Sequence, residues 1–269
     1  MSGELTNEMN PQQTLAWYVD MGVDEVIGDE AVDHFTTIPI KNANTEAVTA
    51  PVTPVAPTKK PRVALTLSAS EGALLATKIA KTAKTVAELK TAIEGFDGCG
   101  LIRTAMNTVF ADGNEKADIM IVGEAPNADE DRIGQPFVGE VGALLDKMMA
   151  AIGLERSTGF YTTNIVPWRP PGNRKPTDDE LVICLPFIKR HIEFIAPKVL
   201  FLMGHTAISA LLNDHSPTKD VRGKWNILTI GELKIDTIAS YHPSRLLKQP
   251  QAKKASWQDL LDIKAKIGE

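Results

Sequence analysis

Downstream of residue 117, the hydrophobic positions of this chain alternate between two patterns. Short apolar runs with β-branched residues, typical of buried strands, occupy 118–123, 160–167, 198–204, 225–230 and 234–240. Apolar residues at helical spacing lie between them and after the last, at 141–153, 177–196, 205–213 and 256–268. Because parallel strands need long crossover connections, this alternation predicts a parallel sheet covered by helices.

The first part of the chain has a different character. Residues 48–61, "VTAPVTPVAPTKKP", alternate Pro with Ala, Val and Thr, which favours an extended connector. We therefore expect an N-terminal acidic extension at 1–47 with one candidate short helix, a linker at 48–62 and a folded domain at 63–269. Two helices are predicted directly after the linker, at 70–82 and 85–96.

The net charge of −5 is distributed unevenly. Residues 1–62 carry 9 acidic and 4 basic side chains, whereas residues 63–269 carry 25 of each. A neutral domain still permits a local cluster of Lys and Arg for phosphate contacts, but it argues against wide wrapping of DNA.

The sequence shows no signal for secretion or for membrane insertion. Its first residues lack a basic segment followed by an apolar one, and no run approaches the roughly 18 apolar residues of a membrane span. The two cysteines, Cys99 and Cys184, are too few for a disulfide framework and are expected to be reduced. We expect a monomer in the cytoplasm, that is, the bacterial cytosol or nucleoid.

Three polar segments follow predicted strands. They are "GEAPNADED" from Gly123, "PWRPPGNRKP" from 167 and "SYHPSRLLKQP" from 240. Ligands of open parallel sheets bind beyond the carboxyl ends of the strands. The three segments are therefore expected to form one site.

The first two segments offer groups that could recognise a planar ligand. Phe137, between Pro136 and Gly139, could stack on such a ligand or simply belong to the core. The amide of Asn164 could pair with the edge of a base or form a turn. Arg169 and Arg174, on a Pro-containing loop, suit phosphate contacts or surface solubility equally.

The third segment combines a histidine with groups suited to a DNA backbone. His242 is followed by the hydroxyl of Ser244 and by the cations Arg245 and Lys248 around two leucines. A lone histidine is more often structural, but this combination fits an enzyme that grips a bent backbone and inserts apolar residues into the base stack.

Together these motifs resemble the uracil-DNA glycosylase superfamily, and family 4 most closely. The resemblance rests on "GEAPNADEDRIGQPFVG", "YTTNIVPWRPPGNRKPT", "CLPF", "PKVLFLMG" and "HPSRLL", in order, over about residues 99–260. It implies a three-layer α/β/α fold with a central, mainly parallel four-stranded sheet. It also implies hydrolysis of the N-glycosidic bond of a uracil nucleotide flipped out of DNA, the first step of base excision repair.

The resemblance also implies roles for individual residues. Phe137 would stack on uracil, Asn164 would bind its Watson–Crick edge and His242 would donate to its O2. Glu124 and the Gly123 backbone would line the sugar and water side, and Glu130 would orient the water. The flanking phosphates would be held by the segment of Ser244, Arg245 and Lys248, with Arg169 and Arg174 as further DNA contacts.

The sequence departs from the family at two places. Family 4 members bind a [4Fe–4S] cluster through four cysteines, whereas this chain keeps Cys99 and Cys184 and has Phe96 and Trp168 at the other two positions. We therefore predict no cofactor and apolar packing in place of the cluster. Asn127 replaces the Gly that closes GEAPG, where we expect Asn to tolerate a left-handed backbone.

Two alternatives to a glycosylase remain. One is a protein that binds uracil-DNA and traps the abasic sugar, as a relative does through a His on an inserted basic loop, but residues 166–177 contain no such insertion. The other is a non-catalytic repair scaffold. In either case the extension at 1–47 is a candidate for recruiting a repair or replication protein.

Overall fold

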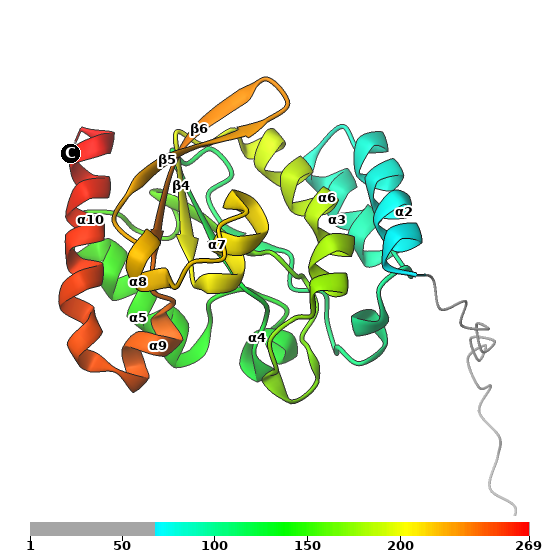
Figure 1. Cartoon of the computed structure of the whole chain (residues 1–269), viewed down its shortest axis with the longest axis horizontal. Helices are drawn as coiled ribbons and strands as arrows, with labels where there is room; N and C mark the ends of the chain where they lie inside the picture. The colour runs from blue at the N-terminus through cyan, green and yellow to red at the C-terminus, as the bar shows by residue number, and fades with distance from the viewer. Residues whose placement is uncertain (1–67, 269) are drawn as a thin grey trace, which may run out of the picture. The chain divides into compact units, whose positions relative to one another are not determined.

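The computed structural model describes residues 68–268, and Figure 1 shows how their helices surround one sheet. The strands are β1 (Ala111–Gly113), β2 (Ile119–Gly123), β3 (Phe160–Asn164), β4 (Val199–Met203), β5 (Trp225–Ile230) and β6 (Leu233–Ser240). Their order is β1-β3-β2-β4-β6-β5, with β3, β2, β4 and β6 parallel and the edge strands β1 and β5 antiparallel. The predicted parallel four-stranded centre is confirmed.

Helices flank this sheet on both faces. They are α2 (Ala69–Thr82), α3 (Val86–Glu94), α4 (Ala128–Ile133), α5 (Gly139–Ala150), α6 (Asp178–Ile195), α7 (His205–Leu212), α8 (Thr218–Val221), α9 (Pro243–Lys248) and α10 (Lys253–Ile267). Short 3₁₀ turns occupy Gly100–Arg103, Pro171–Asn173 and Pro250–Ala252. No helix among residues 68–268 is both long and apolar enough to cross a lipid bilayer.

Alternate residues of the central strands supply two separate cores. Met120 and Leu200 belong to a cluster with side chains of α2, α3, α6 and α7, whereas Ile121 and Phe201 belong to a cluster with side chains of α5 and α10. Because successive side chains of a strand point to opposite faces, apolar runs without polar interruptions are what a sheet covered on both faces requires. The three-layer α/β/α prediction is therefore confirmed.

Three predictions from the sequence need correction. The antiparallel edge strand β1 was not expected, because three residues of "ADG" give no apolar signal. The acidic segment "ADEDRI" is the helix α4, and "PSRLLK" is the helix α9, rather than loops. The predicted extension at 1–47 and linker at 48–62 lie outside the described residues.

Candidate active site

The carboxyl ends of β2 and β3 bring three predicted residues together. Gly123 and Asn164 are register partners at these ends. A Cβ atom on Gly123 would overlap Asn164 Oδ1 and would lie 2.8 Å from Phe137 Cζ. Glycine is therefore required at 123, because the amide and the aromatic ring both pack against its Cα.

Phe137 occupies an unusual backbone conformation just before α5. Its φ is 52°, in the left-handed region, and its side chain is 1% exposed. The ring stacks on the imidazole of His242, with centroids 5.6 Å apart and planes inclined by 25°. The ring thus reaches the third strand end, where His242 follows β6.

Asn164 is buried but keeps part of its hydrogen-bonding capacity free. Its Nδ2 has no hydrogen-bond partner within residues 68–268. A buried amide without partners costs about 1–3 kcal/mol, so it is expected to find a partner when a ligand is bound. An amide offers both a donor and an acceptor, which suits the edge of a pyrimidine.

His242 is the N-cap of α9, and its hydrogen bond with Ser244 indicates the tautomer of its ring. Its Nδ1 accepts a hydrogen bond from the backbone N–H of Ser244 at 3.3 Å and lies 2.9 Å from Ser244 Oγ. An accepting Nδ1 leaves the proton of a neutral ring on Nε2. Burial lowers the pKa of His242, while the nearby Glu124 raises it. The ring is therefore a neutral hydrogen-bond donor near pH 7.

Glu124 is held by the first turn of α7. Its Oε1 accepts the backbone N–H of Thr206 at 3.0 Å. Gly204 has a φ of 99°, and a Cβ there would lie 2.8 Å from Glu124 Cδ, so the backbone needs glycine on both counts. The structure thus fixes the carboxylate while leaving Oε2 without a hydrogen bond to any residue in 68–268.

Glu130 is more fully engaged. Its Oε2 accepts the backbone N–H of Asn127 at 2.8 Å and its Oε1 accepts that of Phe137 at 2.5 Å. Burial raises its pKa to about 7, against the lowering effect of these two bonds. Glu130 therefore holds the backbone at both ends of α4, a structural task that its pattern in the sequence did not reveal.

The rest of the acidic segment also differs from expectation. Asn127 is the N-cap of α4 in an extended conformation, with φ −89°, and its side chain accepts the N–H groups of Asp129 and Glu130. The tolerance of Asn for a left-handed backbone is therefore not used at this position. Asp131 is buried and accepts the backbone N–H of Met106 at 2.8 Å, whereas Asp129 is exposed and pairs with Arg132.

A cleft of about 270 Å³ opens beside these residues. Glu124, Glu130 and His242 line it, together with three of the predicted DNA contacts, Arg174, Ser244 and Lys248. Asn173 and Lys175 also line it; we did not single them out, although "GNRKP" places them beside Arg174.

The predicted cations are not all free to bind phosphate. Arg174 makes a bidentate ion pair with Glu180, with N···O distances of 2.8 and 2.6 Å. Arg169 lies outside the cleft, bonds Asn173 at 2.7 Å and sits 3.9 Å from Asp131. Arg245, also outside, lies over the Tyr241 ring at 4.3 Å. Of the five predicted DNA contacts, only Ser244 and Lys248 combine a place in the cleft with freedom from an ion pair among the described residues.

Phe137 and Asn164 do not line this cleft, because Gly123 and His242 pack over them. The slot between the aromatic ring and the amide is closed off from the cleft in this structure, and the imidazole of His242 stacks on the Phe137 ring.

The positions expected for a cluster lie in the core between α6 and the first helices. Phe96 and Trp168 are buried and stacked, with centroids 6.1 Å apart, and the indole N–H donates to Thr108 Oγ1 at 3.1 Å. Contact with Cys99 and burial raise the pKa of the Cys184 thiol. Two thiols beside two aromatic rings do not fit a cluster of four thiolates, and residues 68–268 contain no group of three metal-ligating side chains.

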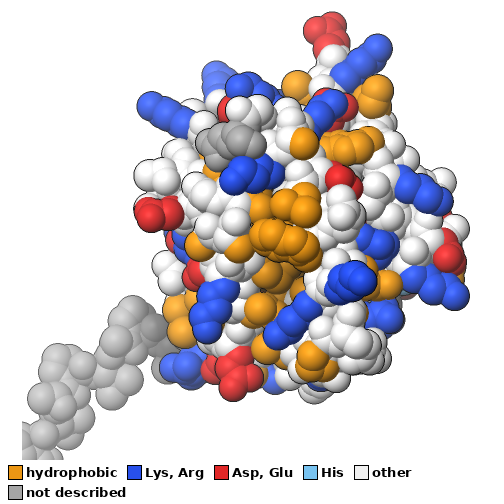
Figure 2. All heavy atoms as spheres, turned by 90° about the vertical axis from the view of Figure 1, so that its left-hand side faces the viewer, with side chains coloured by type: hydrophobic (Ala, Val, Ile, Leu, Met, Phe, Trp, Pro, Cys, Tyr) orange, Lys and Arg blue, Asp and Glu red, His pale blue; other side chains and the backbone are white. Residues whose placement is uncertain are grey.

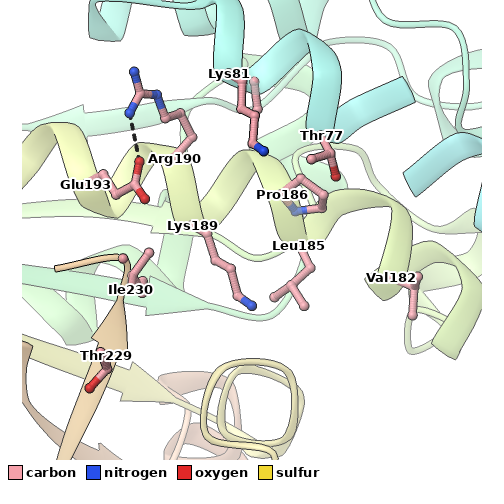
Figure 3. A pocket seen from close by; sticks show the side chains of 12 residues that line it. Thr77, Lys81, Val182, Leu185, Pro186, Lys189, Arg190, Glu193, Thr229 and Ile230 are labelled. Atoms are coloured by element: carbon pink, nitrogen blue, oxygen red, sulfur yellow. Dashed lines mark hydrogen bonds and ion pairs between the residues drawn. The ribbon is translucent and has the colours of Figure 1, made fainter. Parts of the chain in front are cut away.

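Two further surfaces lie away from the site. A cavity of about 400 Å³ lies between α2, α6 and the end of β5. Figure 3 shows Arg190 paired with Glu193 at this cavity, and Lys81 and Lys189 extending from the two helices. Figure 2 shows apolar side chains, surrounded by Lys and Arg, on the face of α5 and α10. There a hollow of about 230 Å³ includes Trp257.

Comparison with known proteins agrees with this geometry. The model of the uracil DNA glycosylase superfamily matches residues 110–261. A type-4 uracil-DNA glycosylase of Archaeoglobus fulgidus is 40% identical over 175 residues, which cover 64% of this chain and 85% of that protein. The type-4 enzyme of Thermotoga maritima is 40% identical over 152 residues, 56% of this chain and 77% of its own.

A third relative is much longer than the region that it shares with this chain. A DNA polymerase of Bacillus phage SP01 is 34% identical over 139 residues, which cover 52% of this chain but 14% of the polymerase. The matched region is thus a small part of that protein. Because the family model matches more than half of the chain and the type-4 relatives are 40% identical to it, the chain belongs to the uracil-DNA glycosylase superfamily, in family 4.

Proposed function

We propose that this protein is a uracil-DNA glycosylase that flips one uracil nucleotide out of DNA and hydrolyses its N-glycosidic bond. The observation that carries the proposal is that Phe137 and Asn164 both pack against the Cα of Gly123, while the imidazole of His242 stacks on the Phe137 ring. An aromatic face, an unpartnered amide and a neutral imidazole N–H are the groups that a flipped pyrimidine needs.

The chemistry follows from where charge develops. Breaking the bond leaves negative charge on uracil and positive charge on the sugar. The Nε2–H of His242 donates to the uracil oxygen that gains charge, and the amide of Asn164 holds the base edge. No covalent step on the protein is required.

We assign the carboxylate of the sugar side to Glu124 rather than Glu130. Glu124 lines the cleft, is fixed through Oε1 by Thr206, and keeps Oε2 available for the attacking water. Both oxygens of Glu130 already accept backbone N–H groups, and its pKa of about 7 leaves it only partly ionised near neutrality. Water orientation by Glu130, expected from the sequence, is thus the weaker assignment.

Base entry requires the closed slot to open. In the proposed cycle, Ser244 and Lys248 hold the flanking phosphates at the cleft while uracil displaces His242 from Phe137. Stacking on the ring contributes about 1–3 kcal/mol and offsets part of the cost of unstacking the base from DNA. Because α9 carries His242, Ser244 and Lys248, backbone binding and slot opening involve the same helix.

The test is release of uracil from a labelled oligonucleotide with one deoxyuridine, followed by alkaline cleavage of the abasic strand. We expect strand breaks only at the uracil position, and none in a control oligonucleotide that carries thymine instead. Asn164→Ala should release uracil about 100-fold more slowly than the wild-type protein. No cleavage with enzyme in large excess would refute the proposal. A protein–DNA adduct that survives SDS would instead favour the covalent trap.

The candidate role of the N-terminal extension is separate from this chemistry. We propose that residues 1–47 recruit a repair or replication protein, with no part in turnover. A variant that lacks residues 1–62 should then release uracil at the full-length rate. A large loss of turnover would refute this separation.

A further inference from the structure

We infer that Arg156 is a positioning residue that sets the orientation of the Phe137 ring and thereby the affinity of the site for uracil. The inference rests on the proposed function, because it concerns the residue that stacks on the base. Arg156 lies in the connection between α5 and β3.

The backbone of Phe137 is held from both sides by side chains with ionisable groups. Its N–H donates to Glu130 Oε1 at 2.5 Å, and its carbonyl oxygen accepts from Arg156 Nη2 at 3.0 Å. The left-handed conformation of a bulky residue costs about 1–2 kcal/mol and persists only where neighbouring groups enforce it. A carboxylate and a guanidinium on this one residue supply that restraint.

Three contacts hold the side chain of Arg156 in place. Its Nη1 pairs with Asp112 of β1 at 3.1 Å, and its Nε bonds Asp146 of α5 at 2.9 Å. Its guanidinium also lies 5.6 Å from the centre of the Phe160 ring. The side chain is 20% exposed, so these bonds are partly shielded from water. Arg156 thus ties Phe137 to a strand and a helix at once.

Gly142 restricts the position of the Phe137 carbonyl group. A Cβ on Gly142 would overlap this oxygen and would lie 3.7 Å from Arg156 Nη2. The first turn of α5 therefore packs directly against this carbonyl. Since χ1 of Phe137 starts from this backbone, a shift of the carbonyl turns the ring that faces His242.

Arg190 provides a matched control. It is also partly buried, with 29% exposure, donates to a backbone carbonyl, that of Ala83, at 2.9 Å, and pairs with Glu193 at 2.7 Å. It lies in the cavity of Figure 3, away from the strand ends of the site. Replacing Arg190 removes the same kinds of contact without touching Phe137.

The experiment compares Arg156→Met with Arg190→Met in the full-length protein. The readouts are the melting temperature, the inhibition constant of free uracil and the Kd for DNA without uracil. We expect both variants to melt lower, whereas only Arg156→Met should raise the inhibition constant, by about 10- to 100-fold, because a charged hydrogen bond is lost. Binding to DNA without uracil should stay unchanged, and Arg156→Lys should recover part of the uracil affinity.

Equal inhibition constants in the two methionine variants would overturn the inference. If Arg156→Met does not fold, Asp146→Asn replaces it in the test, because this variant removes one hydrogen-bond partner of the guanidinium. It should raise the inhibition constant of uracil about 2- to 5-fold. An unchanged inhibition constant would again overturn the inference. Failure of the proposed function looks different, because the wild-type protein would then release no uracil.

Discussion

Gly142→Ala should impair the base site although alanine is the better helix former. In the interior of a helix, alanine is favoured over glycine by about 1 kcal/mol. At 142, however, the new methyl would lie 2.5 Å from the carbonyl carbon of Phe137, and ordinary contact begins near 3.4 Å. The methyl would also overlap the carbonyl oxygen, so the carbonyl must move by at least about 1 Å, which disturbs its bond with Arg156.

The expected effects on stability and on turnover differ in size. Overpacking costs about 1–3 kcal/mol, so after the helical gain the net loss is about 2 kcal/mol or less. A misplacement of 1 Å can reduce turnover by about 100-fold. The variant should thus be folded at 25 °C and nearly inactive.

The assay is single-turnover uracil release at 25 °C, with the melting curve recorded on the same preparation. Gly100→Ala is the control, because a Cβ at 100 would meet no atom within 4 Å. Wild-type turnover and uracil inhibition in Gly142→Ala would refute the reasoning, because the carbonyl of Phe137 would then be free to move without consequence.

Three more predictions follow from individual side chains. The pKa of Glu130 is about 7 in the folded protein against a usual 4.5, so the folded state holds an extra proton between these pH values. The free energy of unfolding should therefore fall by about 3 kcal/mol from pH 4.5 to 7.5. Denaturant titrations of Glu130→Gln should show a smaller fall. Because burial lowers the pKa of His242, the kcat/KM of Glu130→Gln, which lacks the carboxyl group that titrates near 7, should stay level as pH falls from 8 through 6.5, and a titration at 6.5 in this variant would contradict a neutral imidazole donor. Purified protein should contain no stoichiometric iron, and about four irons per chain would overturn the assignment of Phe96 and Trp168 to apolar packing.

The sheet and the place of the site could be predicted because both depend on long apolar runs. The strands "IMIVG", "FYTTN" and "VLFLM" are buried at every position, so they can be recognised without tertiary information. Once the strands are parallel, their polar ends must meet at one edge. That rule was enough to bring Gly123, Asn164 and His242 together.

The rest of the site depends on contacts between distant short segments, which leave no periodic signal. No pattern in the sequence singled out Arg156, because its partners Asp112 and Asp146 lie 44 and 10 positions away. Glu130 was assigned a catalytic role, because the sequence alone does not distinguish a glutamate that accepts two backbone N–H groups from one that orients water. α4 was missed because its stability comes from the Asn127 cap and from the burial of Glu130 and Asp131, not from amphipathic length.

The tight approach of α5 to the Phe137 carbonyl has a consequence for redesign. Phe137 cannot be changed alone to make this slot accept a bulkier base, because Gly142 packs against its carbonyl and Arg156 is hydrogen-bonded to it. Changes would have to be introduced at Gly142 and Arg156 together, and a library that varies one position at a time would miss every functional combination.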